Sequence, residues 1–295
     1  MFNLIKMNLY RLFRQKSFYV LLGTAVLIGW FMVFMVWMTP RLEEQAEKAR
    51  ELRAQNGGQT EETGFHVGVI VGVTEGDDGQ ESAPKPEAFN VAEFMDEYFT
   101  AGFPMILISV GAAIIANGDR KRGFIKNLGG QMKPRGMLPI SKLPAILLEI
   151  AGLYGVTVLS FVLFGRIYFE KFTLGSLSAM CRAMGVQLVL GLAFGAIILL
   201  ISTAARNAAS GIIAGIIVAS GLFPYVYFFI NRVAKAYFGA PENFDISGCS
   251  LDYYISCVTS KAAGKEIAVA LMAGVVYLAL ASAAGWFVME KRDIV

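Results

Sequence analysis

Long apolar runs alternate with short polar segments along this chain of 295 residues. Six runs are long enough to cross a bilayer; five contain no Asp, Glu, Lys or Arg, and the sixth contains Glu149 as its one charged residue. They cover residues 17–40, 98–118, 143–165, 183–205, 207–231 and 267–289. Roughly 20 apolar residues span a hydrocarbon core, and a charge at the centre of a span costs at least about 2.5–3.5 kcal/mol. The pattern therefore predicts an all-α integral membrane protein with six transmembrane helices.

Two further segments have patterns of their own. Residues 1–16 carry apolar positions at helical spacing with basic residues on the flank, which predicts an amphipathic helix lying on the membrane surface. Residues 41–97 form the one long insertion, in which 41–55 is expected to be helical and 65–73 to be a short strand. Asn90 and Glu93 have the spacing of a capping box that starts a helix leading into the second span. Two roles for this insertion stay open: a sensory or substrate-entry role, and that of a passive cap over the spans.

Composition and charge then set the orientation. Hydrophobic residues make up 56% of the chain, which leaves little for a soluble catalytic domain. The 119–142 loop carries seven Lys and Arg residues against one acid, Asp119, so the positive-inside rule places this loop and both termini in the cytoplasm of a multi-pass cell-membrane protein. The net charge of +3 averages a basic cytoplasmic side and an acidic outer side. It gives no argument for nucleic acid, whereas the basic side would meet anionic lipid headgroups.

The residue types exclude several kinds of chemistry. His66 is the one histidine, and the cysteines form no C-x-x-C pair, so no metal site is expected. An intramembrane serine protease would place a histidine in a span, and a metalloprotease would carry H-E-x-x-H; the chain has neither. Cys249 and Cys257 share one predicted outer loop, so the sequence leaves open whether they form a disulfide or stay reduced.

Within the spans, Glu149 is the main polar candidate. An intramembrane carboxylate is a functional-site hypothesis, here a substrate or proton contact, and snorkelling or pairing inside the bundle is the alternative. Gly191 with Gly195, and Gly211 with Gly215, predict close packing of the fourth and fifth spans. Pro224 is expected to kink the fifth span toward its outer end.

The loop at 119–142 is the most specific motif. It has the order Asp119, Gly123, Ile125, Lys126, Asn127, Leu128, Arg135, Ser141 and Lys142. With the interfacial helix and six spans, this order resembles the permease subunits of ABC transporters of the type-2 exporter class, especially bacterial permeases related to bacitracin-resistance and lantibiotic-immunity transporters. Phe124 stands where that family commonly has a small hydroxyl residue, and the first outer loop is longer than in the smallest members.

The resemblance implies that the loop contains a coupling helix that docks into a separate ATP-binding subunit, with the 1–16 elbow helix nearby. The contact residues it implies are Gly123, Phe124, Ile125, Lys126, Asn127, Leu128 and Arg135. The simpler alternative is a basic loop that only enforces topology. The resemblance further implies two ATPase copies, a second permease copy forming a homodimer or a related heterodimer, and export of an amphipathic peptide, antibiotic or lipid-like cargo, as in antimicrobial peptide resistance.

No G-x-x-x-x-G-K-[ST] motif occurs in the sequence, so ATP and Mg²⁺ would be bound by the partner subunit and this chain is expected to bind no cofactor and not to be an enzyme. Two other functions stay open. An ion-coupled secondary transporter would use Glu149, although inverted repeats, broken spans or several buried ionisable groups would be usual for that class. A non-transporting membrane sensor or scaffold would keep the outer loop and tolerate loss of the coupling loop.

Overall fold

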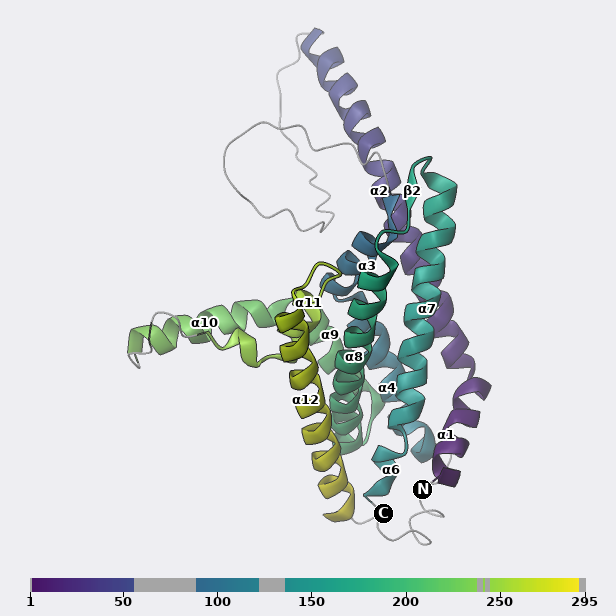
Figure 1. Ribbon diagram of the computed structural model, residues 1–295, viewed down its shortest axis with the longest axis vertical. Coiled ribbons are helices and arrows are strands. Elements are labelled where there is room, and N and C mark those ends of the chain that lie inside the picture. The colour runs from purple at the N-terminus through teal and green to yellow at the C-terminus, as the bar shows by residue number, and fades with distance from the viewer. Residues whose placement is uncertain (1, 56–88, 122–135, 238–240, 242–244, 292–295) are drawn as a thin grey trace.

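The computed structural model describes residues 2–55, 89–121, 136–237, 241 and 245–291, with the side chains of 42–55 and 119–121 left out. The described chain is a bundle of helices, most of them running along one long axis (Figure 1). Four helical segments are each long and apolar enough to cross a membrane, and two bent helix pairs raise that number to six if each pair is one span. The expected all-α architecture with membrane-spanning helices is therefore confirmed in its coarse form; within the described residues, between four and six helical units have the length and apolar character of a span.

The N-terminal region is two helices, α1 (Phe2–Arg14) and α2 (Lys16–Gln55). In α1 the side chains of Asn8 and Leu12 are buried against the bundle, whereas Phe2 and Tyr10 are exposed. Apolar side chains thus lie on both faces of α1, as suits a helix placed between protein and lipid. The helix α2 continues without a break through the predicted first span and Pro40 into the predicted helical part of the insertion.

The second predicted span is a bent pair, α3 (Val91–Thr100) and α4 (Phe103–Lys121), with an angle of 62° between them. The bend lies at Gly102, whose φ of +75° is a left-handed conformation that glycine adopts without strain. The side chain of Asn90 accepts a hydrogen bond from the Ala92 amide at 3.2 Å, so the predicted helix start at Asn90 is confirmed. Glu93 instead forms an ion pair with Lys261 at 3.1 Å.

The third and fourth spans are continuous. A short helix α6 (Met137–Ile140) leads into α7 (Leu143–Tyr168), and α8 (Leu177–Ala205) follows after a turn. Before α3, strand β1 (Phe89–Asn90) pairs in parallel with strand β2 (Phe172–Thr173), which lies in the connection between α7 and α8. This two-stranded sheet ties the start of α3 to the turn between α7 and α8.

The fifth predicted span, 207–231, is not one helix. It is divided into α9 (Ala208–Ala219) and α10 (Leu222–Tyr237), which are bent by 68°. The bend lies at Gly221, with φ of +70°, rather than at Pro224 as the sequence predicted. Pro224 falls in the first turn of α10, where a proline interrupts no hydrogen bond within the helix. As Figure 1 shows, α10 points away from the bundle, and it has no buried residue.

The last part of the chain returns to the bundle through the short helices η1 (Ser247–Cys249) and α11 (Leu251–Cys257) and ends with α12 (Gly264–Lys291). Cys249, Cys257 and Cys181 are free thiols and all three are exposed, so the structure contains no bond between Cys249 and Cys257.

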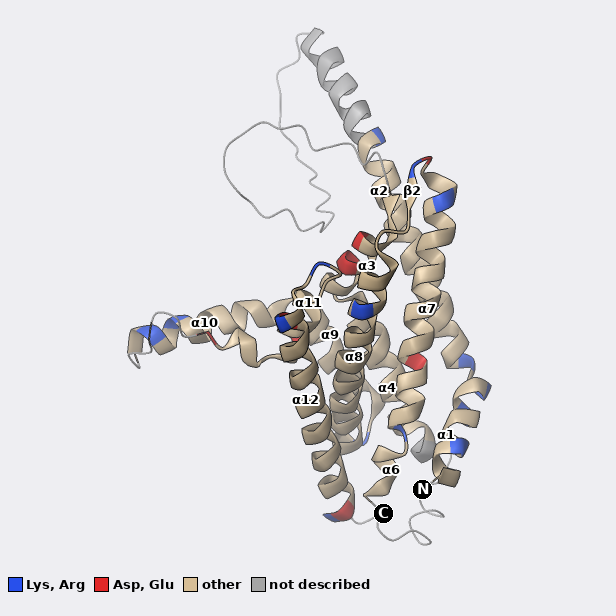
Figure 2. Cartoon of the chain, in the orientation of Figure 1, with Lys and Arg blue, Asp and Glu red and all other residues tan. Residues whose placement is uncertain are grey.

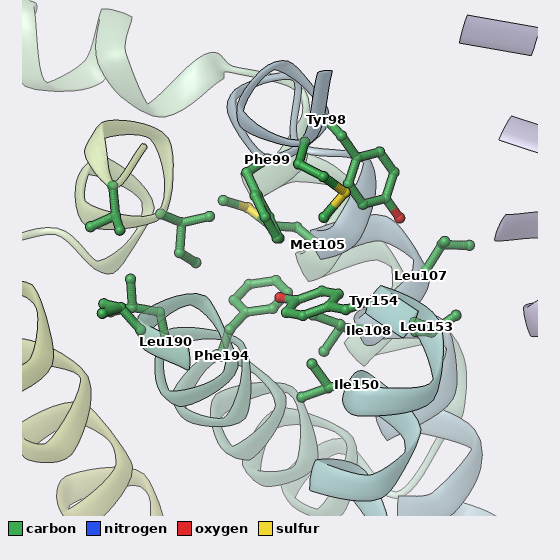
Figure 3. Packing of buried hydrophobic residues seen from close by; sticks show 14 of the residues in the cluster. Tyr98, Phe99, Met105, Leu107, Ile108, Ile150, Leu153, Tyr154, Leu190 and Phe194 are labelled. Atoms are coloured by element: carbon green, nitrogen blue, oxygen red, sulfur yellow. The ribbon is translucent and has the colours of Figure 1, made fainter. Parts of the chain in front are cut away.

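The core surrounds α8, which contacts α4, α7, α9 and α12. Figure 3 shows part of the core, where Tyr154 and Ile150 of α7 meet Ile108 of α4 and Phe194 of α8. Gly191 and Gly195 permit this approach. A Cβ at 191 would lie 2.9 Å from the Tyr154 hydroxyl, and one at 195 would lie 2.7 Å from Ile146 Cγ2. The predicted close packing of these two glycines is confirmed within the chain itself.

Charged residues gather at the two ends of the bundle, along α1 and on the outer part of α10, with few in the middle of the bundle (Figure 2). The exceptions inside the bundle are therefore informative, because an uncompensated charge or polar group in an apolar surrounding is costly.

Candidate functional site

One carboxyl group lies inside the apolar bundle. Glu149 is the seventh residue of α7 and is 1% exposed. It faces Gly111 of α4, and a Cβ at position 111 would overlap the Glu149 carboxyl group. Glycine at 111 is therefore what lets a side chain as long as glutamate fit between the two helices.

Neither carboxyl oxygen of Glu149 has a hydrogen-bond partner within the described part of the chain. Most buried polar atoms in proteins are hydrogen-bonded, so a carboxyl group without partners calls for an explanation beyond packing. A buried acid inside a membrane domain is a site at which a proton or a polar group of a substrate can bind. The predicted intramembrane candidate is thus buried inside the bundle, which argues against the snorkelling alternative.

A group of polar contacts lies between Glu149 and the end of the bundle that holds the chain termini. Lys142, at the start of α7, is 6% exposed and donates from Nζ to the Ala116 carbonyl at 2.8 Å. Asn117 of α4 is also buried, and its Nδ2 donates to the Ala113 carbonyl at 3.0 Å. Lys142 precedes Glu149 by seven residues, a rise of about 10 Å along a helix. The contact from Lys142 joins the start of α7 to the last turns of α4, on either side of the 119–142 loop.

The interfacial helix is attached to the same place. Asn8 of α1 donates from Nδ2 to both the backbone carbonyl and the hydroxyl of Ser141, each at 3.1 Å. Ser141 Oγ in turn donates to the Leu138 carbonyl at 2.8 Å. Asn8 and Ser141 are both buried, so these bonds are shielded from water. A side chain of α1 therefore holds the junction between α6 and α7.

The last helix holds the other end of α6. Glu290 of α12 accepts a hydrogen bond from the Gly136 amide at 3.1 Å through Oε2. The Trp286 ring lies against Gly136 so closely that a Cβ at 136 would collide with it. Gly136 is the first residue that the structure describes in the C-terminal part of the 119–142 loop. The C-terminal part of this loop is thus held by α12 at Gly136 and by α1 at Ser141.

The structure describes only part of the site that the sequence predicted. Gly123, Phe124, Ile125, Lys126, Asn127, Leu128 and Arg135 lie outside the described residues, so their proposed contact surface stays a prediction. Ser141 and Lys142 of the same motif are buried at the base of the loop. Among the described residues, no group of three His, Cys, Asp or Glu side chains is placed to hold a metal ion.

Several residues in and around the site were missed by reasoning from the sequence. Asn8 is one polar residue in an amphipathic helix, and Gly111 is one of 31 glycines, so neither has a distinguishing local pattern. Gln187 was also missed. It lies fully buried in α8 and donates from Nε2 to the carbonyls of Ile255 and Val258, at 2.8 and 3.0 Å. Its position inside an uncharged span was the available signal, because a polar side chain there needs a partner.

Comparisons of the chain with protein families, with curated proteins and with solved structures find no match. The functional argument therefore depends on the residues and contacts of the chain itself.

Proposed function

We propose that this chain is the permease subunit of an ABC exporter of the type-2 class, which moves an amphipathic peptide, antibiotic or lipid-like cargo with ATP hydrolysed by a separate subunit. The proposal draws on the motif in the 119–142 loop, on the amphipathic helix α1 and on the apolar helices that follow it. In this proposal the protein lies in the cell membrane with both termini in the cytoplasm. It works with a second permease copy and two ATP-binding subunits.

The observation that carries the proposal is the attachment of the loop exit. A coupling element has to pass a displacement to the spans, and it can do so only through contacts that do not yield. Here the C-terminal part of the loop is held at Gly136 by Glu290 of α12 and at Ser141 by Asn8 of α1. Lys142 adds a contact to α4. A movement of the loop would therefore reach α1, α4, α7 and α12 together.

The test is co-purification in mild detergent with the ATP-binding protein encoded beside this chain. Phe124→Asp combined with Asn127→Asp should abolish co-purification, because two added carboxylates oppose docking into a complementary groove. Gln131→Asp combined with Met132→Asp adds the same charge to the same loop outside the predicted contact residues and should leave the complex intact. Equal loss in both double variants, or no association of the wild-type chain, would refute the coupling-helix assignment.

Ion-coupled transport is the second candidate, and the buried, unpartnered carboxyl group of Glu149 is the observation that favours it. If Glu149 carries a proton during transport, Glu149→Gln should abolish uptake or efflux driven by a pH gradient while the protein still folds. The two candidates separate when proteoliposomes that contain the chain alone are compared with proteoliposomes that also contain the ATP-binding subunit. Transport driven by a proton or sodium gradient without ATPase supports the second, whereas transport that requires ATP and the partner subunit supports the first.

A further inference from the structure

A cavity lies where α10 leaves the bundle, and Glu149 is not among the residues that line it. Its volume is about 340 Å³, within the range of roughly 300–1,000 Å³ that small-molecule sites occupy. Side chains from α8, α9 and the start of α10 form an apolar wall: Phe194, Ile197, Val218 and Phe223. The remaining wall comes from η1, α11 and α12.

Most polar groups at the edge of the cavity are already bonded. The hydroxyls of Tyr227 and Ser250 share a hydrogen bond of 2.5 Å, and the Tyr277 hydroxyl donates to the Cys249 carbonyl. Asp252 differs from them. Within the described chain its carboxylate has no ion pair and no hydrogen bond, and burial raises its pKa above the ordinary range. The cavity thus combines an apolar wall with one acidic group that has no counter-charge.

We propose that this cavity binds an amphipathic organic cation, with the apolar body of the ligand between Phe194, Val218 and Phe223 and its positive group beside Asp252. A cation is the complement that the site lacks, since an opposite charge placed within about 4–6 Å stabilises a partly desolvated carboxylate. An apolar body would displace poorly bonded water from the wall and gain about 25 cal/mol per Å² of apolar surface buried.

A membrane-soluble ligand would meet further apolar surface on the way to the cavity. Leu222 and Val226 of α10, beside the cavity-lining Phe223, are 52% and 47% exposed. These side chains continue the apolar character of the wall onto the outside of the helix. This binding site needs neither the ATP-binding subunit nor the basic loop, so its existence and the proposed transport function can fail independently.

The test measures binding of radiolabelled tetraphenylphosphonium to the purified full chain in phosphatidylcholine nanodiscs, with empty nanodiscs subtracted. We expect saturable binding that unlabelled tetraphenylphosphonium displaces and that tetraphenylborate, of matched shape and opposite charge, does not. Asp252→Asn should weaken binding at least tenfold. Glu170→Gln removes an equal charge from an exposed position between α7 and β2 and should bind as the wild type does.

A second variant keeps the test decisive if Asp252→Asn does not fold. Val218→Trp fills the cavity from α9 and should abolish saturable binding, while a single symmetrical peak in size-exclusion chromatography shows that the variant is folded. Absence of saturable binding to the wild type would overturn the proposal. So would equal displacement by the anion, or undiminished binding in folded Asp252→Asn or Val218→Trp protein.

Discussion

The carboxyl group of Glu149 occupies the space beside Gly111 that a side chain at position 111 would need. The two residues lie on α7 and α4 in the buried part of the bundle. Their fit depends on one residue having a long side chain and the other none. This complementarity places a polar group inside the membrane domain without separating the helices, and it can be tested from either partner.

Gly111→Ala should destabilise the protein, because the added methyl group forces Glu149 out of its position. Overpacking of a core typically costs about 1–3 kcal/mol. The measurement is thermal unfolding in detergent, in which the fraction of folded protein after heating is read from the height of the monodisperse peak in size-exclusion chromatography. Gly155→Ala is the matched control. Gly155 lies on the same helix as Glu149, and no neighbouring side chain lies within 4 Å of the methyl group that the substitution adds. The midpoint temperature of unfolding of this control should stay unchanged or rise slightly, because alanine lowers the conformational entropy of the unfolded chain.

The double variant decides whether the cost comes from this pair. In Gly111→Ala combined with Glu149→Ala the carboxyl group is gone, so the second substitution should recover part of the stability that the first removed. Coupling between residues in contact is typically about 0.5–3 kcal/mol. Simple additivity of the two single variants would contradict direct contact between the two side chains.

Asn8→Ala should loosen α1 from the bundle. The substitution removes both hydrogen bonds to Ser141 and leaves a buried carbonyl without its side-chain donor. Such a loss is typically about 1–1.5 kcal/mol, and about 1.4 kcal/mol corresponds to a tenfold larger equilibrium constant for local opening. We therefore expect amide hydrogen exchange in α1 to accelerate by about that factor, with little change in α12. Asn3→Ala, an exposed asparagine on the same helix, is the control. Equal exchange in the two variants would show that Asn8 does not hold α1.

Much of this architecture could be predicted from the sequence, because apolar run length is a direct consequence of bilayer thickness. The ends of the four continuous spans differ from their predicted ranges by at most six residues. The helix start at Asn90 was also predicted, since a cap is a local feature. These features depend on residues close together in the chain or on composition alone.

The bends and the polar contacts could not be predicted in the same way. Hydropathy is continuous through Ser220 and Gly221, and a glycine inside an apolar run is equally compatible with a straight span, so α9 and α10 were expected to form one helix. Asn8 and Ser141 are separated by 133 positions. No local pattern specifies such a pair, because the contact exists only after α1 and α7 have packed together.

Gln187→Met should destabilise the packing of α11 against α8. Methionine keeps the length of the side chain and removes the two donors that reach the carbonyls of Ile255 and Val258. A buried carbonyl left without a partner costs about 1–3 kcal/mol. The midpoint temperature of thermal unfolding should fall, and amide hydrogen exchange in α11 should accelerate. Gln187→Glu keeps the shape with acceptors only and should be at least as harmful; a methionine variant as stable as the wild type would contradict the role of these bonds.

Acid should loosen the segment that returns from α10, because Asp245 is bonded there mainly in its charged form. Ser247 donates to its carboxylate from the hydroxyl at 2.6 Å and from the amide at 2.9 Å, and Asn231 Nδ2 donates at 2.8 Å. These bonds, with a smaller contribution from Lys235, lower the pKa of Asp245 below its ordinary range. A lowered folded-state pKa means that the stabilisation is complete above about pH 4 and is lost as the pH falls through the lowered value.

The measurement is hydrogen exchange at the amides of Ile246 and Ser247, corrected for intrinsic chemical rates, between pH 6 and pH 2.5. Protection should be constant down to about pH 4 and fall below it. Asp245→Asn retains a hydrogen-bonding side chain that does not titrate, so its protection should be lower throughout and independent of pH in this range. Glu170→Gln should keep the wild-type profile. A step that persists in Asp245→Asn, or that occurs near neutral pH, would assign the acid sensitivity of this segment to another group.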